Sequence, residues 1–198
     1  MRVRPLHVLS AALLAVSLLL SGCSSLEGTG DKGYVTAGGQ ITELNPGDRK
    51  DPIDLSGKDL DGKQVSVEDH RGKVVVIPIW GYWCTECHEE APLLTEVANE
   101  SDQSQVAFLG INNRDATADT AKAFVRQYDV PYPSIFDPSA RALLAFDGSL
   151  TPYSTPSTVI LDRQGRVAAI VLGVIPSKTT LTSLIKKVSK EKGTDADG

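Results

Sequence analysis

Three residue types are scarce in this chain of 198 residues, which contains three cysteines, three histidines and one methionine. If Cys23 belongs to an export signal, as argued below, only Cys84 and Cys87 remain for the body of the protein. A framework of structural disulfides is then excluded, and the pair must be a redox centre or part of a ligand site. The single methionine is Met1, so the usual axial ligands of a haem protein are also in short supply.

The sequence also lacks an excess of positive charge. It has 20 Lys and Arg against 25 Asp and Glu, a formal net charge of −5. Without residues 1–22, which include Arg2 and Arg4 and no acidic residue, 18 basic residues face 25 acidic ones and the net charge is −7. This balance argues against nucleic acid as a partner. It also offers no electrostatic attraction to anionic lipid head groups.

The apolar run near the N-terminus, from Val8 to Leu20, is too short to cross a membrane comfortably as a helix. Two arginines precede it and small residues follow, which is the three-part layout of an export signal over residues 1–22. The tetrapeptide "LSGC", which ends at Cys23, resembles the bacterial lipobox. We therefore expect cleavage before Cys23 and a lipid on that cysteine, so that a hydrophobic anchor attaches the mature lipoprotein to the membrane.

The rest of the chain suits one globular domain, since 41% of all residues are hydrophobic and 23% are charged. Residues 23–44 hold the lipidated cysteine and a segment rich in Gly, Ser and Thr, which predicts a flexible tether. Residues 191–198 are polar and are expected to be a disordered tail. Residues 45–190 should form the domain, and we see no internal repeat in them.

Strand and helix patterns alternate along this domain. Residues 51–69 hold two short runs split by Asp61-Gly62, which predicts a hairpin, and "KVVVIPIW" predicts a strand buried on both faces. A helix is expected to start at Cys84, with a kink at Pro92. Apolar periodicity predicts two more helices, over 117–130 and around 181–188. Further strands are expected over 105–111, 157–162 and 166–173. The predicted order is β-hairpin, β, α, β, α, β, β, α.

The segment "WCTECHEE", from Trp83 to Glu90, matches three motifs at once. C-x-x-C-H has the spacing of covalent haem attachment, C-x-x-C alone is a redox dithiol, and two thiols with an imidazole can begin a zinc site. A cysteine at a helix N-terminus lies among unpaired N–H groups, which stabilise its thiolate. Cys84 is therefore expected to be the exposed nucleophile. Cys87, one turn further and less exposed, would resolve the mixed disulfide.

The strand ending in "IWGYWC", the C-x-x-C at a helix start and the later Thr155-Pro156 together resemble thioredoxin-fold proteins. Among these they resemble the membrane-tethered thiol-disulfide oxidoreductases of the TlpA and ResA kind, over roughly residues 45–188. The resemblance implies a thioredoxin-like three-layer α/β fold, with a central mixed sheet flanked by helices, an N-terminal β-hairpin and an insertion before a cis-proline. It also implies that Pro156 is that cis-proline, lying against the C-x-x-C, and that the backbone of Thr155 pairs with an extended substrate strand.

Other functions remain open for the same residues. Haem attachment would leave only His70 as a second axial ligand, because the other candidates are removed with the signal. A zinc site would need both thiols, His88 and His70 to converge. We expect His88 on the helix surface and expect no cofactor or metal. A c-type haem-binding electron carrier is the alternative function.

A peroxidase of the same fold would carry Thr or Ser three residues before its reactive cysteine, where this chain has Gly81. Trp80 and Trp83 each suit either core packing or a rim that faces the substrate. Trp83 directly precedes Cys84, so we assign it to substrate binding.

Proton transfer is where the sequence departs from its relatives. Thioredoxins place a buried Asp six residues before the first cysteine, and this chain has Pro78 there. Proline takes no proton and removes an N–H from a central strand, so we expect a local bulge or irregularity. Glu90, three residues after Cys87 on the same helix face, is the nearest substitute. In partly apolar surroundings its raised pKa would suit a general base toward Cys87. Alternatively, Glu90 only complements a helix N-terminus, together with Glu86 and Glu89.

The sequence thus predicts a thiol-disulfide oxidoreductase, anchored through Cys23 outside the bacterial cell membrane and acting on disulfides of exported proteins. Reduction is favoured over oxidation, because the resembling group mostly keeps particular thiols reduced, among them apocytochrome cysteines before haem attachment. A reductase also needs a source of electrons, so we expect a membrane-embedded electron donor as a second partner.

Overall fold

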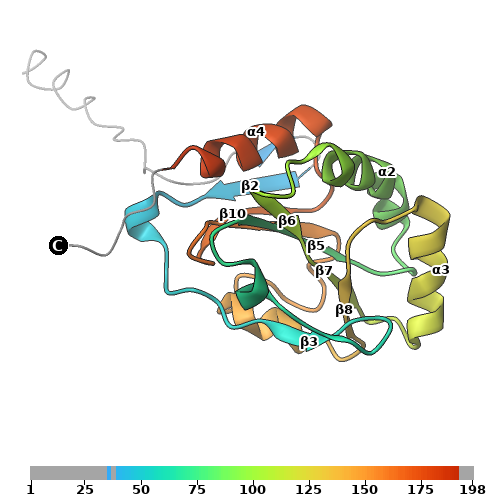
Figure 1. The fold of residues 1–198 in the computed structure, drawn as a ribbon. Coiled ribbons are helices and arrows are strands. Elements are labelled where there is room, and N and C mark those ends of the chain that lie inside the picture. Colours follow the sequence, from blue (N-terminus) through green and yellow to red (C-terminus); the bar gives the residue numbers. More distant parts are fainter. Residues whose placement is uncertain (1–34, 37–38, 192–198) are drawn as a thin grey trace, which may run out of the picture. The chain divides into compact units, whose positions relative to one another are not determined.

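The computed structural model describes residues 35–36 and 39–191 (Figure 1). The predicted export signal, the lipidation site Cys23 and most of the predicted tether lie outside these ranges. Within them, no helix combines the length and the apolar character that a membrane crossing requires.

A mixed sheet forms the centre of the fold, in the order β1-β2-β10-β9-β5-β7-β8, with β6 also paired to β5. Its central strand β5 runs parallel to β6 and β7 and antiparallel to β9, which is the mixed sheet predicted for this chain. The strands are β1 (Val35–Thr36), β2 (Gly39–Glu43), β5 (Val74–Trp80), β6 (Val106–Phe108), β7 (Gly110–Asn113), β8 (Ser134–Asp137), β9 (Ser157–Leu161) and β10 (Val167–Leu172). The predicted N-terminal hairpin is confirmed as a separate two-stranded sheet of β3 (Ser56–Lys58) and β4 (Gln64–Ser66).

Three α-helices lie within the described residues, at the places that the apolar pattern predicts. They are α2 (Thr85–Glu100), which continues on both sides of Pro92, α3 (Ala118–Tyr128) and α4 (Lys178–Ser189). Three short 3₁₀ helices, η1 (Pro46–Asp48), η2 (Val67–His70) and η3 (Ala142–Phe146), lie in the connections. Side-chain caps begin the last two α-helices, because Thr117 and Ser177 each accept a backbone N–H three residues later.

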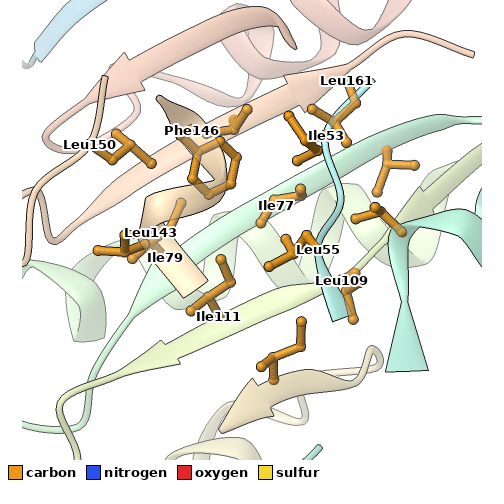
Figure 2. Close-up of a cluster of buried hydrophobic side chains, with 14 of the residues drawn as sticks. Ile53, Leu55, Ile77, Ile79, Leu109, Ile111, Leu143, Phe146, Leu150 and Leu161 are labelled. Carbon is orange, nitrogen blue, oxygen red and sulfur yellow. The ribbon is translucent and has the colours of Figure 1, made fainter. Parts of the chain in front are cut away.

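The two faces of β5 supply two hydrophobic cores. All seven of its residues are buried, and successive side chains point to opposite faces. Val74 and Val76 pack with residues of α2 and α4, and Ile77 and Ile79, on the opposite face, pack with residues of η3 and of the segment that leads into β3. Figure 2 shows this second core, where Leu143 and Phe146 of η3 approach Ile77 and Ile79 of the sheet. The sheet is therefore covered on both faces, which holds the carboxyl end of β5 in place.

Pro78 interrupts the hydrogen bonding of β5 on one side only. Against β9 the register is unbroken and Pro78 lies opposite Thr158. On the parallel side the N–H of Leu109 donates to the carbonyl of Val76 over 3.1 Å. The return bond would need an N–H at residue 78, which proline lacks, and β6 and β7 are accordingly separate strands on either side of Leu109. The predicted irregularity is confirmed, as a missing ladder bond and not as a bulge.

Three features of the sheet and its ends differ from the prediction. Residues 39–43, assigned to the tether, form β2 and pair with β10, so the folded region begins before residue 45. Glu191, assigned to the tail, is held by the Arg49 guanidinium through contacts of 2.6 and 2.7 Å. The strand β8 was not predicted within the insertion. The strands β2 and β8 are short and carry little apolar periodicity, and contacts with residues distant in the sequence fix their structure and that of Glu191.

Candidate active site

The two cysteines lie at the N-terminus of α2, as predicted. Cys84 is the N-cap residue and is joined to Cys87 by a disulfide whose Cα atoms are 5.2 Å apart. The Cys84 Sγ accepts the backbone N–H of Cys87 over 3.1 Å. The sulfur thus occupies the place of an N-cap oxygen, where the first amides of the helix stabilise negative charge. This geometry favours a thiolate on Cys84 once the disulfide is reduced.

The expectation that Cys84 is exposed and Cys87 less so is wrong for this disulfide form. Each is only 2% exposed, and both belong to a cluster with Trp80, Ala91 and Phe124. A side chain that caps a helix turns back over the first turn to reach its amides. In this fold that direction leads into the cluster.

The two tryptophans before the dithiol have different environments. Trp80 is 4% exposed, stacks on Phe124 with ring centroids 4.4 Å apart, and donates from Nε1 to Ser134 Oγ over 3.1 Å. Trp83 is 47% exposed and donates from Nε1 to the carbonyl of Asn113 over 2.9 Å. Trp80 is therefore a core residue, and Trp83 lies on the rim beside Cys84.

Gly81 is required by the close packing of Trp83. A Cβ at this position would lie 2.5 Å from Trp83 Nε1 and 2.9 Å from the carbonyl oxygen of Asn113. The Thr or Ser that a peroxidase of this fold carries here would displace the Trp83 ring. The difference from the peroxidase pattern thus has a steric reason.

The bond between Thr155 and Pro156 is cis, as predicted. Pro156 is buried, and the side chain of Thr155 accepts a hydrogen bond from Asn113 Nδ2 over 2.8 Å. Within residues 39–191, neither the N–H nor the carbonyl of Thr155 takes part in a backbone hydrogen bond. Asn113 therefore ties the Trp83 segment to the cis-proline loop, through its own carbonyl on one side and its amide on the other.

Two buried polar residues, the last residue of β7 and one just after the strand, were missed by sequence reasoning. Asn113 is fully buried, and Asp115 is 3% exposed. The Asp115 carboxylate accepts the backbone N–H of Tyr82, with oxygens at 3.0 and 3.2 Å, and accepts Asn112 Nδ2 at 2.7 Å. These bonds fix the turn that presents Cys84. The only available sign was polar residues at the end of an apolar strand, in "LGINNRD".

His88 is not a free residue of the helix surface, which corrects the prediction. Its Nε2 lies 2.7 Å from the carbonyl oxygen of Tyr82, and its Nδ1 lies 2.9 Å from the hydroxyl of Tyr128. A carbonyl only accepts, so Nε2 carries the hydrogen. The ring also contacts the rings of Tyr82, Phe124 and Tyr128. The partner Tyr128 comes from α3, which the periodicity of α2 could not reveal.

Glu90 is 4% exposed, and its Oε1 accepts the backbone N–H of Ile175 over 2.6 Å. Burial raises the pKa of Glu90 from 4.5 to about 7, and the hydrogen bond from Ile175 offsets part of that effect. The raised pKa is as predicted for a carboxyl in apolar surroundings, whereas Glu86 and Glu89 are exposed. Among the described residues, no three His, Cys, Asp or Glu side chains gather in a way that could hold a metal ion.

The family model described as "AhpC/TSA family" matches residues 49–170, which is more than half of the chain. The chain belongs to the AhpC/TSA family. It is similar to the thiol-disulfide oxidoreductase ResA of Bacillus thuringiensis subsp. konkukian (strain 97-27), with 27% identity over 177 residues, 89% of this chain and 96% of the relative. A ResA of Bacillus cereus is 28% identical over 131 residues, 66% of this chain and 72% of the relative.

Solved structures agree with this assignment. A secreted thiol-disulfide isomerase from Corynebacterium glutamicum superposes with a TM-score of 0.72 at 28% identity, covering 80% of this chain and 98% of the other. A DsbF homologue from Corynebacterium diphtheriae gives a TM-score of 0.70 at 30% identity, covering 80% of this chain and 99% of the other. The AhpC/TSA protein described here is therefore a ResA-like, thioredoxin-fold thiol-disulfide oxidoreductase.

Proposed function

We propose that the protein works outside the bacterial cytoplasmic membrane, held there by lipid on Cys23, and reduces disulfides in exported proteins through Cys84 and Cys87. Two features of the same site carry the proposal. The sulfur of Cys84 caps a helix, and the backbone of Thr155 in the cis-proline loop has no hydrogen-bond partner among the described residues. The export signal in the sequence supports the location, and the relative from Corynebacterium glutamicum is described as secreted. The ResA resemblance favours the reducing direction.

The reaction is a pair of thiol-disulfide exchanges. The Cys84 thiolate attacks one sulfur of the substrate disulfide, and the other substrate sulfur leaves as a thiolate that takes up a proton. The Cys87 thiolate then attacks the Cys84 Sγ, which closes the disulfide of the present structure and releases the second substrate thiol. Two electrons pass from the enzyme dithiol to the substrate. A membrane-embedded dithiol donor would return the enzyme to its reduced form by the reverse exchange.

Substrate binding is assigned to the rim around the dithiol. The free backbone groups of Thr155 suit an extended segment that adds to the cis-proline loop as a short strand. Trp83 is half exposed on the rim beside Cys84 and offers a flat apolar surface to the same segment. Apocytochrome segments that await haem attachment are one substrate class of this form.

Glu90 is assigned to proton transfer from Cys87. It lies one turn along the same face of α2, and with a pKa of about 7 it is partly deprotonated near neutral pH. In Glu90→Gln the rate of the second exchange should fall and its dependence on pH should change, because Gln accepts no proton. The exposed Glu89→Gln is the matched control. If both variants keep the parent profile, Glu90 has no part in proton transfer.

A c-type haem carrier remains the alternative, but the geometry gives it less support. The imidazole that would bind iron in C-x-x-C-H is His88, and both of its ring nitrogens have partners. A visible spectrum of the purified protein distinguishes the two functions. A Soret band that survives denaturation would favour the haem carrier.

Trapping of the mixed disulfide tests the proposal directly. Cys87→Ser should accumulate a covalent adduct on Cys84 when exported proteins are present, because the resolving thiol is missing. Cys84→Ser is the matched control and should form none. Adducts on Cys84→Ser alone would reverse the two roles, and adducts on neither would contradict the dithiol mechanism.

Cell fractionation tests the anchor separately. Cys23→Ala should release the domain from membranes, because it removes the site of lipidation. Persistent membrane binding of this variant would contradict the lipid tether while leaving the dithiol mechanism intact.

A further inference from the structure

An arginine lies between two exposed aromatic rings on the rim of the dithiol. The guanidinium carbon of Arg114 is 5.1 Å from the ring centroid of Trp83 and 5.4 Å from that of Tyr153. Trp83 is 47% exposed and Tyr153 is 83% exposed. Trp83 directly precedes Cys84, and Tyr153 lies two residues before Thr155. Arg114 therefore joins the two segments that frame the proposed substrate site.

The charge of Arg114 is unpaired among the described residues, where no hydrogen bond or ion pair involves its guanidinium. The adjacent carboxylate, Asp115, is buried and accepts the N–H of Tyr82 and the amide of Asn112 instead. Ring contacts hold the side chain of Arg114, so its N–H donors stay free at the surface. A planar guanidinium held in this way is suited to a two-point hydrogen bond with a carboxylate.

The backbone conformation and backbone hydrogen bond of residue 114 do not explain why an arginine stands there. Its φ of 64° is in the left-handed region, which glycine adopts more easily than any residue with a side chain. The backbone N–H donates to the carbonyl of Asp137 over 3.1 Å, and any residue but proline can make that bond. The guanidinium itself is therefore the feature of this position that needs a function.

The charges on the two sides of Cys84 have opposite signs. Arg114 contacts the residue before Cys84, whereas the exposed Glu86 and Glu89 follow it along α2. A negative side chain on a substrate would be attracted on the first side and repelled on the second. The rim therefore favours one placement of an acidic residue relative to the reacting cysteine.

We propose that Arg114, held between Trp83 and Tyr153, binds a carboxylate side chain of the substrate, so that the enzyme prefers cysteines with an Asp or Glu about two residues away. The inference rests on the proposed exchange with exported proteins and names a feature of their sequence. The spacing follows from strand geometry. A substrate strand that pairs with Thr155 advances about 3.3 Å per residue, so the substrate residue two positions further along lies at Tyr153. In an antiparallel pairing this residue lies on the C-terminal side of the one facing Thr155.

Synthetic peptides test this preference. Each carries one cysteine in a disulfide with 2-mercaptoethanol, and Glu or Gln stands two residues before or after that cysteine. The reduced enzyme converts each peptide to its free thiol and releases 2-mercaptoethanol while its own dithiol becomes a disulfide. Chromatography of the peptide thiol gives the rate. At low ionic strength, one Glu peptide should react about threefold to fivefold faster than its Gln twin, as expected for a well-placed surface ion pair.

Four further measurements separate a charge contact from a structural role. The Glu-to-Gln rate ratio should fall below about twofold at about 0.5 M salt, because salt screens exposed charges. In Arg114→Gln the ratio should fall to about one, and Arg114→Lys should retain part of it, because lysine keeps the charge but loses the planar fork. Arg126→Gln, a change in an exposed arginine of α3, should leave the ratio of the parent.

The outcomes are distinct. Equal rates for every Glu and Gln pair in the parent, or a preference that persists in Arg114→Gln, would overturn the inference while leaving the exchange reaction in place. A faster reaction of a peptide with Phe in place of Glu would assign the rim to aromatic side chains and overturn the carboxylate contact. Failure of every peptide to react with the parent would count against the proposed function itself, and the inference would fall with it.

Discussion

The buried carboxyl of Glu90 makes the stability of this protein depend on pH in a defined direction. Its pKa is raised from 4.5 to about 7, chiefly by burial. The folded state therefore holds a proton on Glu90 over a pH range in which the unfolded chain has lost it. By linkage, the stability that this proton gives to the folded state is fully present below pH 4.5 and is lost as the pH rises through about 7. The sign is opposite to that of a carboxylate in a salt bridge.

The magnitude follows from the two pKa values. The interval from 4.5 to about 7 corresponds to about 3 kcal/mol of unfolding free energy, at 1.36 kcal/mol for each tenfold change. Glu90→Gln removes the titration and can still accept the N–H of Ile175. The free energy of unfolding of this variant, minus that of the parent, should therefore increase by about 3 kcal/mol between pH 4.5 and pH 8.

Urea titrations of the oxidised protein at several pH values measure this difference, and the intact disulfide keeps thiol ionisation out of the result. Tyr132 does not interfere, because burial and, to a lesser extent, the charge of Glu90 raise its pKa. Glu89→Gln is the control for a change of charge at an exposed neighbouring position. A difference between Glu90→Gln and parent that varies by less than about 1 kcal/mol over this range would refute a strongly raised pKa.

Three other substitutions follow from contacts in the structure. Gly81→Ala should destabilise the protein by about 1–3 kcal/mol and slow exchange, because its Cβ would lie 2.5 Å from Trp83 Nε1; unchanged stability and tryptophan emission would contradict this. His88→Ala should lower the free energy of unfolding by about 1 kcal/mol through the loss of its hydrogen bonds, which a denaturant titration can detect. Arg49→Met should cost about 1–3 kcal/mol, because Asp162, 3% exposed, loses a partner at 3.0 Å but keeps the Arg166 guanidinium at 2.8 Å; a thermal scan that shows no loss would disprove it.

Local residue patterns made the strand and the helix on either side of the dithiol's turn predictable. The strand β5 is apolar throughout, and the helix after it shows its N-terminus through the cysteine motif and its buried face through apolar periodicity. The cis bond before Pro156 and the mixed character of the central sheet came from the family resemblance, because no local pattern of residues encodes them. Local residue patterns therefore located the dithiol and the strand that precedes it, and the resemblance added the cis-proline.

What escaped prediction depends on contacts between distant segments. Strand β2 contains one aliphatic residue, Ile41, and is fixed by pairing with β10 about 130 residues away, so no periodic pattern marks it. His88 was assigned to the helix surface because its partner Tyr128 lies on another helix. The burial of Cys84 was missed for a related reason, since helix position predicts the direction of a capping side chain but not what lies there.

The absence of an acid on β5 bears on how protons move in this site. Pro78 replaces the strand carboxyl that thioredoxins use, and the opposite residue is Thr158, whose Oγ1 is buried without a partner among the described residues. Neither side chain accepts a proton at neutral pH. The buried acid on the dithiol's own helix is Glu90, and a hydrogen bond to the loop before α4 holds it there. Burial raises the pKa of this helix carboxyl to about 7. In the proposed mechanism, a carboxyl with that pKa would take a proton from Cys87 when the disulfide closes and return it when the enzyme is reduced again.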